Sequence, residues 1–201
     1  MASSVPWKQQ LSTGTEAVQD EVVRWYQESR RGKGYVPDMV WGTLQTEAYA
    51  TVILRKVVNF LGVPDDVPAG VAKRMERQQV LYDGEHHYDV ILGEQALYTN
   101  VGGPKVMREQ MERLLRDFDL PSLSLGIVPA TAEVSVFPVP GFDMNDGGQA
   151  SYELVSTGVD ITDPDEIALH DKAFNALSEA ACYGAAARGL TRKALAFWRS
   201  E

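Results

Sequence analysis

Among the side chains in this sequence with the chemistry to carry a proton in a reaction, three stand out, namely Glu94, His86 and Tyr152. Glu94 follows the apolar segment 88–93, and a carboxylate there is costly to bury unless it is paired. A histidine titrates near pH ~6.5 when unperturbed, which suits an acid or a base at neutral pH. If the protein is an enzyme, these three residues are its candidate catalytic groups.

Glu94 also has a structural interpretation. Arg77 can pair with it, because a guanidinium offers a carboxylate a fork of two hydrogen bonds. Alternatively, the Glu94 carboxylate caps the helix that we expect to start near residues 101–105. We predict that Glu94 and Arg77 lie close together, either as a structural ion pair or as part of a ligand site.

The stretch GTLQTEAYA, residues 42–50, contains the candidate binding residues Gln45, Thr46 and Tyr49. Gln45 and Tyr49 are one helical turn apart and therefore share a face. We predict that these three side chains line a ligand pocket together with Arg77 and Glu94. The alternative is that Gln45 ties two helices together, because a buried amide needs hydrogen-bond partners in either case.

Two further patterns are weaker signals. In GEHHYD, His86 and His87 are adjacent, so on a strand they point to opposite faces, and structural zinc needs about four ligands. We therefore predict no metal site, and no cofactor-binding motif is visible. NVGGPK, residues 100–105, resembles an anion cradle at a helix start, although most such turns only begin a helix.

The elements that must position these residues follow from hydrophobic periodicity. Helical patterns start at Thr15 and cover residues 44–62, 67–83, 102–118 and 165–190, and residues 30–38 break the first of them. Strand patterns cover residues 88–93, 122–129, 133–144 and 150–161, with a hairpin turn at 145–148. Pro138 and Pro140 make the 133–144 segment an edge or bulged strand.

This order predicts an α+β fold with N-terminal helices, a small mostly antiparallel sheet with a packed helix, and a long C-terminal helix. We expect residues 1–14 to form a flexible N-terminal arm and residues 15–201 to form a single domain.

Composition limits the class of protein. The chain has 201 residues, of which 44% are hydrophobic, and a formal net charge of −9. No apolar run reaches the ~18 residues that span a bilayer, and the N-terminus lacks a signal-peptide pattern. Cys182 is the single cysteine, which fits a reducing compartment, so we expect a cytoplasmic protein without a membrane association. The net charge opposes direct specific binding to DNA.

Several ordered motifs resemble one family, the C-terminal domain of unknown function of actinobacterial, antitoxin-like XRE-type helix-turn-helix regulators. The resemblance covers roughly residues 15–190. The residues that match are Gly42, Leu44, Gln45, Thr46, Tyr49, Ala50, Arg77, Gln78, Glu94, Leu97, Val101, Gly102, Gly103, Met107, Gln110 and Leu114. Trp41 and Thr43 depart from the family's proline and leucine. The regulators carry DNA-reading helices upstream, whereas fourteen residues precede the first expected helix here.

The resemblance implies a stand-alone binding module that recognises a small-molecule ligand or a protein partner, with homodimer formation as a further option. The alternative is a cofactor-independent acid–base enzyme, an isomerase, cyclase or lyase of specialised metabolism, built on the same domain. A third option is assembly with a separate helix-turn-helix protein.

Overall fold

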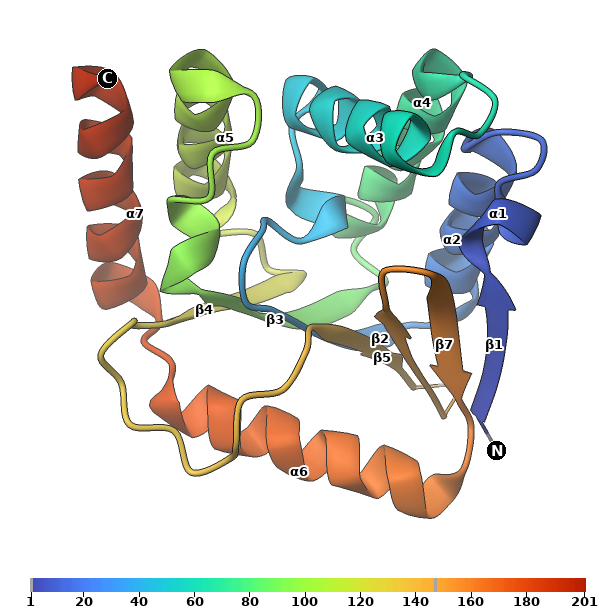
Figure 1. The fold of residues 1–201 in the computed structure, drawn as a ribbon. Helices are drawn as coiled ribbons and strands as arrows, with labels where there is room; N and C mark the ends of the chain where they lie inside the picture. Colours follow the sequence, from blue (N-terminus) through green and yellow to red (C-terminus); the bar gives the residue numbers. More distant parts are fainter. Residues whose placement is uncertain (1, 147) are drawn as a thin grey trace.

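One sheet of seven strands runs through the molecule in the order β1-β7-β6-β5-β2-β3-β4 (Figure 1). The computed structural model describes residues 2–146 and 148–201. The strands are β1 (Ala2–Pro6), β2 (Arg31–Val36), β3 (His87–Gly93), β4 (Leu123–Val128), β5 (Phe142–Asn145), β6 (Gln149–Glu153) and β7 (Thr157–Ile161). β2, β3 and β4 pair in parallel, and the remaining pairs are antiparallel. The predicted α+β class with a mostly antiparallel sheet is therefore confirmed.

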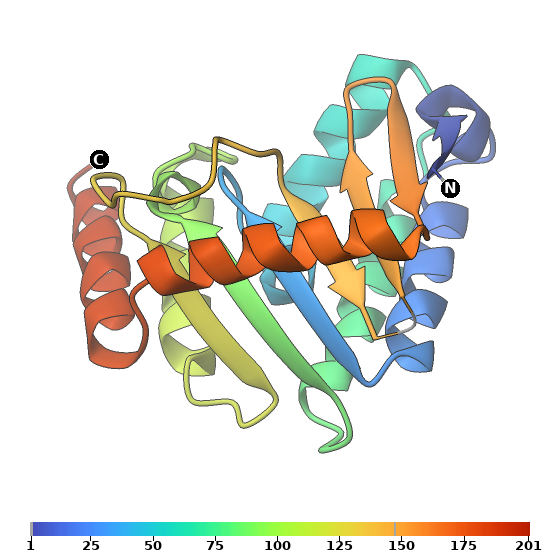
Figure 2. The same cartoon turned by 90° about the horizontal axis from the view of Figure 1, so that it is seen from below.

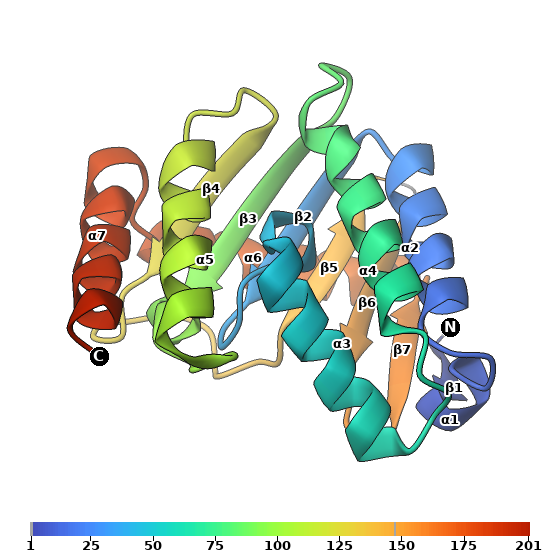
Figure 3. The same cartoon turned by 90° about the horizontal axis from the view of Figure 1, so that it is seen from above.

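Helices cover the two faces of the sheet unequally. They are α1 (Trp7–Gln10), α2 (Glu16–Glu28), α3 (Glu47–Leu61), α4 (Val67–Arg77), α5 (Gly103–Asp117), α6 (Pro164–Ala180) and α7 (Gly184–Ser200), with the 3₁₀ turns η1 (Gly42–Leu44), η2 (Gln78–Leu81) and η3 (Glu94–Leu97). α2, α3, α4, α5 and α7 lie on one face, as Figure 3 shows, and α6 crosses the other face (Figure 2). Among the described helices, none is both long and apolar enough to cross a membrane.

Asp66 joins α2 to α4, the helix pair that covers the candidate site. Its carboxylate accepts hydrogen bonds from the Thr15 hydroxyl at 2.7 Å and from the backbone amides of Thr15 and Glu16 at 2.5 and 2.9 Å. These bonds satisfy amides that begin α2 and would otherwise lack acceptors. Burial raises the pKa of Asp66, but the hydrogen bonds outweigh it, so the pKa lies below its usual value.

Two segments differ from the sequence-based expectation near the N-terminus. Residues 30–38, expected to be only a break, contain β2, which lies at the centre of the sheet between β5 and β3. Residues 1–14, expected to be a flexible arm, contain β1 and α1. β1 pairs with β7, and the Trp7 indole donates to the Leu154 carbonyl at 2.8 Å. Strand pairing supplies backbone partners that the local sequence does not reveal.

Two more segments differ in the second half. The long C-terminal helix ends at Ala180 and resumes at Gly184, which has a positive φ of 53°; between them Cys182 bridges to Ile127 of β4. The break carries the chain from the α6 face to the face of α5 and α7. Residues 133–141 are irregular, and the predicted strand 150–161 is the β6–β7 hairpin. The expected turn at 145–148 includes Gly147, which lies outside the described residues, but β5 and β6 pair antiparallel around it.

The hydrophobic core lies mainly between the sheet and the five-helix face. Leu92, Leu97, Met107 and Leu114 are fully buried there. A smaller core on the opposite face packs Phe142 and Met144 of β5 against α6. The roles of the polar residues singled out in the sequence therefore depend on their positions relative to these two cores.

Candidate functional site

Gln45 is fully buried, and both polar ends of its side chain bond to protein groups. Its amide nitrogen donates to the Val40 carbonyl at 2.8 Å, and its amide oxygen accepts from Arg74 at 2.8 Å. Its backbone carbonyl accepts from the Gln78 side chain at 2.6 Å. This geometry corresponds to the alternative interpretation, in which Gln45 ties the start of α3 to α4.

Tyr49 and Thr46 are also placed by structural hydrogen bonds. The Tyr49 hydroxyl accepts from the Val40 amide at 3.2 Å, so Gln45 and Tyr49 share a face, as expected from their spacing, and both reach residue 40. Thr46 caps α3 by accepting from the Tyr49 amide, and its own amide donates to Gln110 of α5 at 2.8 Å. Burial raises the pKa of Tyr49 to about 12. These residues hold α3 in place and leave little for a ligand to bind.

The structure does not bring Glu94 to Arg77. The Glu94 carboxylate is half-buried and accepts from the Ala130 amide at 2.8 Å, in the loop after β4. Arg77 instead lies over the ring of Tyr26, 5.1 Å from its centroid. Among the described residues, no hydrogen bond or ion pair joins the two side chains. The predicted pairing is therefore wrong: Arg77 packs on Tyr26 of α2 and interacts with Asp143 of β5, whereas Glu94 is bonded to the loop that follows the edge strand β4.

The three candidate catalytic residues do not converge. His86 and Glu94 flank the two ends of β3, whose seven residues span ~20 Å. Tyr152 lies on β6, where its ring stacks on His170 at 6.3 Å. The His86 ring bonds to Asp83 at 2.6 Å, and no group of three or more potential metal ligands occurs in residues 2–146 and 148–201. The NVGGPK segment, a weak anion-cradle signal, begins α5, and its Gly103 amide donates to the Asn100 side chain at 2.8 Å.

A different cluster forms where α2 and α4 cover the sheet, and we call it the arginine–aromatic site: Tyr26, Trp41, Arg77, Tyr88 and Asp143. The three aromatic rings are in mutual contact, with centroids 5.5 to 5.7 Å apart. The Trp41 indole donates to the Asp143 carboxylate at 2.8 Å. Arg77 closes the cluster from α4, and its side chain is 6% exposed.

Glycines at three positions make room for this cluster. A Cβ on Gly32 would lie 2.8 Å from the Tyr88 ring, and one on Gly34 would lie 2.7 Å from the Asp143 carboxylate. A Cβ on Gly42 would overlap the Arg77 guanidinium. The glycines of RGKGYV therefore lie beneath the rings and the carboxylate. Sequence reasoning missed this site, although the alternating glycines, together with Arg74 and Arg77 one turn apart on α4, are a signal for it.

Burial shifts the pKa values of the charged groups in and beside the site. Desolvation raises the pKa of Asp143 to about 6, against the lowering effects of the Trp41 hydrogen bond and the nearby Arg77 charge. Desolvation also lowers the pKa of Arg74 to about 9, and the like charge of Arg77 adds to this. Arg74 is nevertheless well bonded, because Gln19 and Gln45 accept from its guanidinium. The site thus holds two cations and one carboxyl group in a poorly solvated space.

Polar atoms without partners gather around the same rings. In residues 2–146 and 148–201, the buried atoms without a hydrogen bond include Arg77 Nε and His86 Nε2. Arg77 lies over the Tyr26 ring, and His86 stacks on Tyr88 with parallel rings 6.2 Å apart. Such atoms are rare in native proteins and call for an explanation, for example a bound ligand or water.

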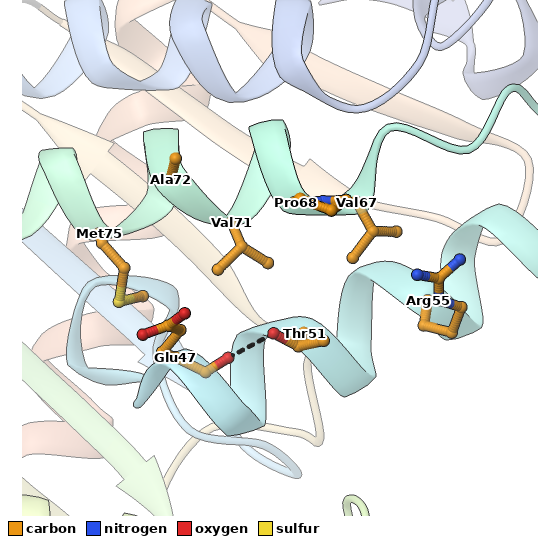
Figure 4. A pocket seen from close by; sticks show the side chains of 8 residues that line it. All are labelled: Glu47, Thr51, Arg55, Val67, Pro68, Val71, Ala72 and Met75. Atoms are coloured by element: carbon orange, nitrogen blue, oxygen red, sulfur yellow. Dashed lines mark hydrogen bonds between the residues drawn. The ribbon is translucent and has the colours of Figure 1, made fainter.

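A shallow groove between α3 and α4 is a second candidate, with a volume of about 560 Å³. Figure 4 shows Val71 and Met75 of α4 pointing toward α3, with Glu47 and Thr51 on the opposite wall. Two of its polar side chains have partners, because Thr51 donates to the Glu47 carbonyl and Arg55 pairs with Asp65, and the Glu47 side chain is exposed. The groove therefore offers apolar surface but no buried polar group that requires a ligand.

The sequence of the chain matches one known protein family. Residues 19–193 match the family described as Domain of unknown function (DUF5753). This match covers most of the chain, so the protein belongs to that family. No curated protein matches the chain.

Two solved structures are similar in the arrangement of their elements. One is TrmBL2, described as an archaeal chromatin protein with a novel mode of DNA binding, at 13% identity and a TM-score of 0.41, covering 92% of this chain. This chain spans only 55% of that protein. The other is NucT from Helicobacter pylori, at 6% identity and a TM-score of 0.49, covering 92% of this chain and 99% of NucT. Likeness at this level transfers no activity to this chain.

Proposed function

We propose that this chain is a ligand-binding module related to the sensor domain of actinobacterial transcriptional regulators, and that the ligand binds at the arginine–aromatic site. One observation carries the proposal. Arg77 is 6% exposed, yet no hydrogen bond or ion pair reaches its guanidinium from the described residues. A buried donor without a partner costs about 1–3 kcal/mol, and a ligand that supplies the partner accounts for its retention.

The contrast with Arg113 supports this assignment. Arg113 is 9% exposed, and its guanidinium bonds to Asp117, Gln78 and Tyr82. The same fold therefore provides partners for a buried arginine where the role is structural. Arg77 has the burial of a structural arginine without the partners of one.

A retention experiment tests the proposal. The wild type, Arg77→Met and Arg108→Met are incubated with the small-molecule fraction of a cell extract, washed by filtration and analysed by mass spectrometry. Arg108 is the matched control, because it lies on α5 and donates to the Trp198 carbonyl. We expect the wild type and Arg108→Met to retain a common compound that Arg77→Met loses. Equal retention by all three proteins, or none by any, would contradict the proposal.

Binding of a protein partner is the other form of this proposal, and the groove between α3 and α4 is its best location. Val67, Val71 and Met75 give the groove an apolar wall, which a partner's apolar side chains could cover. A partner-binding groove would leave the Arg77→Met and Arg108→Met variants equally competent. The two forms are therefore separable with the same proteins.

Acid–base catalysis is the second candidate function, and Asp143 favours it. A carboxyl group with a pKa of about 6 can both accept and donate a proton near neutral pH. Asp143 was not among the candidates from the sequence, and the three candidates Glu94, His86 and Tyr152 do not converge on one site: His86 stacks on Tyr88, Tyr152 stacks on His170, and Glu94 bonds to the Ala130 amide. If the retained compound is released unchanged after prolonged incubation with the wild type, the enzymatic alternative fails.

A further inference from the structure

Arg77 and Asp143 carry opposite charges in the same site but do not form an ion pair. The charge of Arg77 lowers the pKa of Asp143, so the two groups lie close enough to interact. The carboxylate accepts from the Trp41 indole at 2.8 Å, and among the described residues no bond joins it to the guanidinium. The fold thus holds a buried cation and a carboxylate that it attracts without a bond between them among the described residues.

The other charged groups around Arg77 do not replace that missing partner. Arg74 is a second cation, and its bonds go to Gln19 and Gln45. Glu153 of β6 is exposed, and its charge acts on Arg74 and Asp143. Among the described residues, no hydrogen-bond acceptor therefore reaches the N–H donors of the Arg77 guanidinium.

The groups packed around Arg77 are aromatic. The Tyr26 ring lies directly under the Arg77 guanidinium, and Trp41 packs against Tyr26 at 5.7 Å. Trp25 borders the same ring at 4.9 Å in an edge-on arrangement. Aromatic walls favour offset or edge-on contact with another flat ring. The donors of Arg77 favour a carboxylate or phosphate, whose geometry matches the guanidinium fork.

We propose that the ligand is a small aromatic anion, whose carboxylate or phosphate binds Arg77 while its ring packs beside Tyr26 and Trp41. The inference rests on the proposed ligand-binding function and names the class of compound that it serves. A cationic ligand would be repelled by Arg74 and Arg77. A neutral ligand would add no charged partner to Arg77, which attracts Asp143 but forms no bond with it among the described residues.

The four tryptophans provide a built-in readout. Each indole N–H has a separate acceptor: Asp143 for Trp41, Gln149 for Trp25, Leu154 for Trp7 and Leu97 for Trp198. Trp41 and Trp25 border the site, whereas Trp7 lies at β7 and Trp198 on α7. Their four indole resonances in a ¹H–¹⁵N spectrum therefore report on the site and on two remote controls at once.

The test titrates ¹⁵N-labelled protein with benzoate, phenyl phosphate and benzamide, which share a ring and differ in charge. We expect at least one of the two anions to shift the Trp41 and Trp25 signals while those of Trp7 and Trp198 stay in place. The better anion identifies the preferred head group. Benzamide should bind at least tenfold more weakly. Arg77→Lys, which keeps the charge but loses the fork, should weaken anion binding at least tenfold, and Arg108→Met should leave it unchanged.

The outcomes separate this inference from the proposed function. If benzamide binds as tightly as the anions and Arg77→Met abolishes both, the ligand class is wrong but the binding function stands. If no probe shifts Trp41 or Trp25 while the wild type still retains an Arg77-dependent compound, the ligand class is again wrong. If Arg77→Lys and Arg77→Met bind the anions like the wild type, the assignment of Arg77 is wrong. If neither experiment detects binding, both proposals fall.

Discussion

Replacing two buried arginines by methionine should change the stability of the fold by very different amounts. Arg77→Met removes a charge without a hydrogen-bond partner in the described structure, whereas Arg113→Met removes a charge that three side chains hold. Asp117, the carboxylate bonded to Arg113, is 2% exposed. The pair of variants therefore isolates the effect of partners at similar burial.

The magnitudes follow from the contacts. At residue 77, relief of an unsatisfied buried donor gains about 1–3 kcal/mol, and loss of the cation–π contact with Tyr26 costs about 0.5–2 kcal/mol. Loss of the attraction to Asp143 offsets the rest, so we expect a net change within about 1 kcal/mol. Arg113→Met removes the closer of the two guanidinium groups that bind the buried Asp117 and leaves Arg116 at 3.3 Å, so we expect a cost of about 3 kcal/mol, the lower end for a broken buried pair. For a chain of 201 residues, the melting temperatures should differ by roughly 10 °C.

Thermal and urea unfolding followed by circular dichroism measures both variants against the wild type. Two-state analysis gives the free energy of unfolding for each protein. If Arg77→Met loses as much free energy of unfolding as Arg113→Met, Arg77 is a structural residue. The proposal that a ligand binds the Arg77 guanidinium would then lose its support.

Three further predictions concern the elements around the site. Gln45→Leu should lower the free energy of unfolding by about 1–3 kcal/mol and Tyr49→Phe by about 1 kcal/mol, because Arg74 and Val40 lose buried partners; unchanged urea midpoints would contradict this. Burial raises the pKa of Asp143 in the folded state to about 6, above the ~3.9 of an unfolded chain. Its protonated form thus stabilises the fold below pH ~4, and that contribution is lost as the pH rises through about 6. Asp143→Asn should flatten the dependence of stability on pH across this range, and a profile identical to the wild type would show that Asp143 is well solvated. Deleting residues 1–10 should lower the melting temperature, since β7 loses β1 and Leu154 loses the Trp7 indole; an unchanged melting temperature would restore the flexible-arm interpretation.

The sequence by itself determined the helices whose ends are local. α3 begins at the Thr46 cap and ends at Gly62 with a left-handed φ of 66°, and both signals are readable within one turn of the chain. α5 combines a glycine pair, a proline in its first turn and an apolar stripe. Periodicity likewise identified β3 and β4, because their buried residues are contiguous in sequence.

Tertiary structure alone decided the elements that depend on distant partners. β2 carries glycines where a strand pattern would show apolar side chains, and the Tyr88 ring and the Asp143 carboxylate fill the space above them. The N-terminal strand β1 is exposed along its whole length, so only its pairing with β7 defines it. Propensity and periodicity describe neighbours along the chain, and neither element owes its structure to those neighbours.

The candidate site divides in the same way. The sequence singled out Arg77, Gln45 and Tyr49 as candidate binding residues, and the structure places all three in buried positions. It could not assign their partners. Whether Arg77 meets Glu94 or Asp143 depends on the register in which Gly34 pairs with Asp143 and on the side of β2 that α4 covers. That register is fixed by hydrogen bonds between segments about a hundred residues apart, which only the folded sheet brings together.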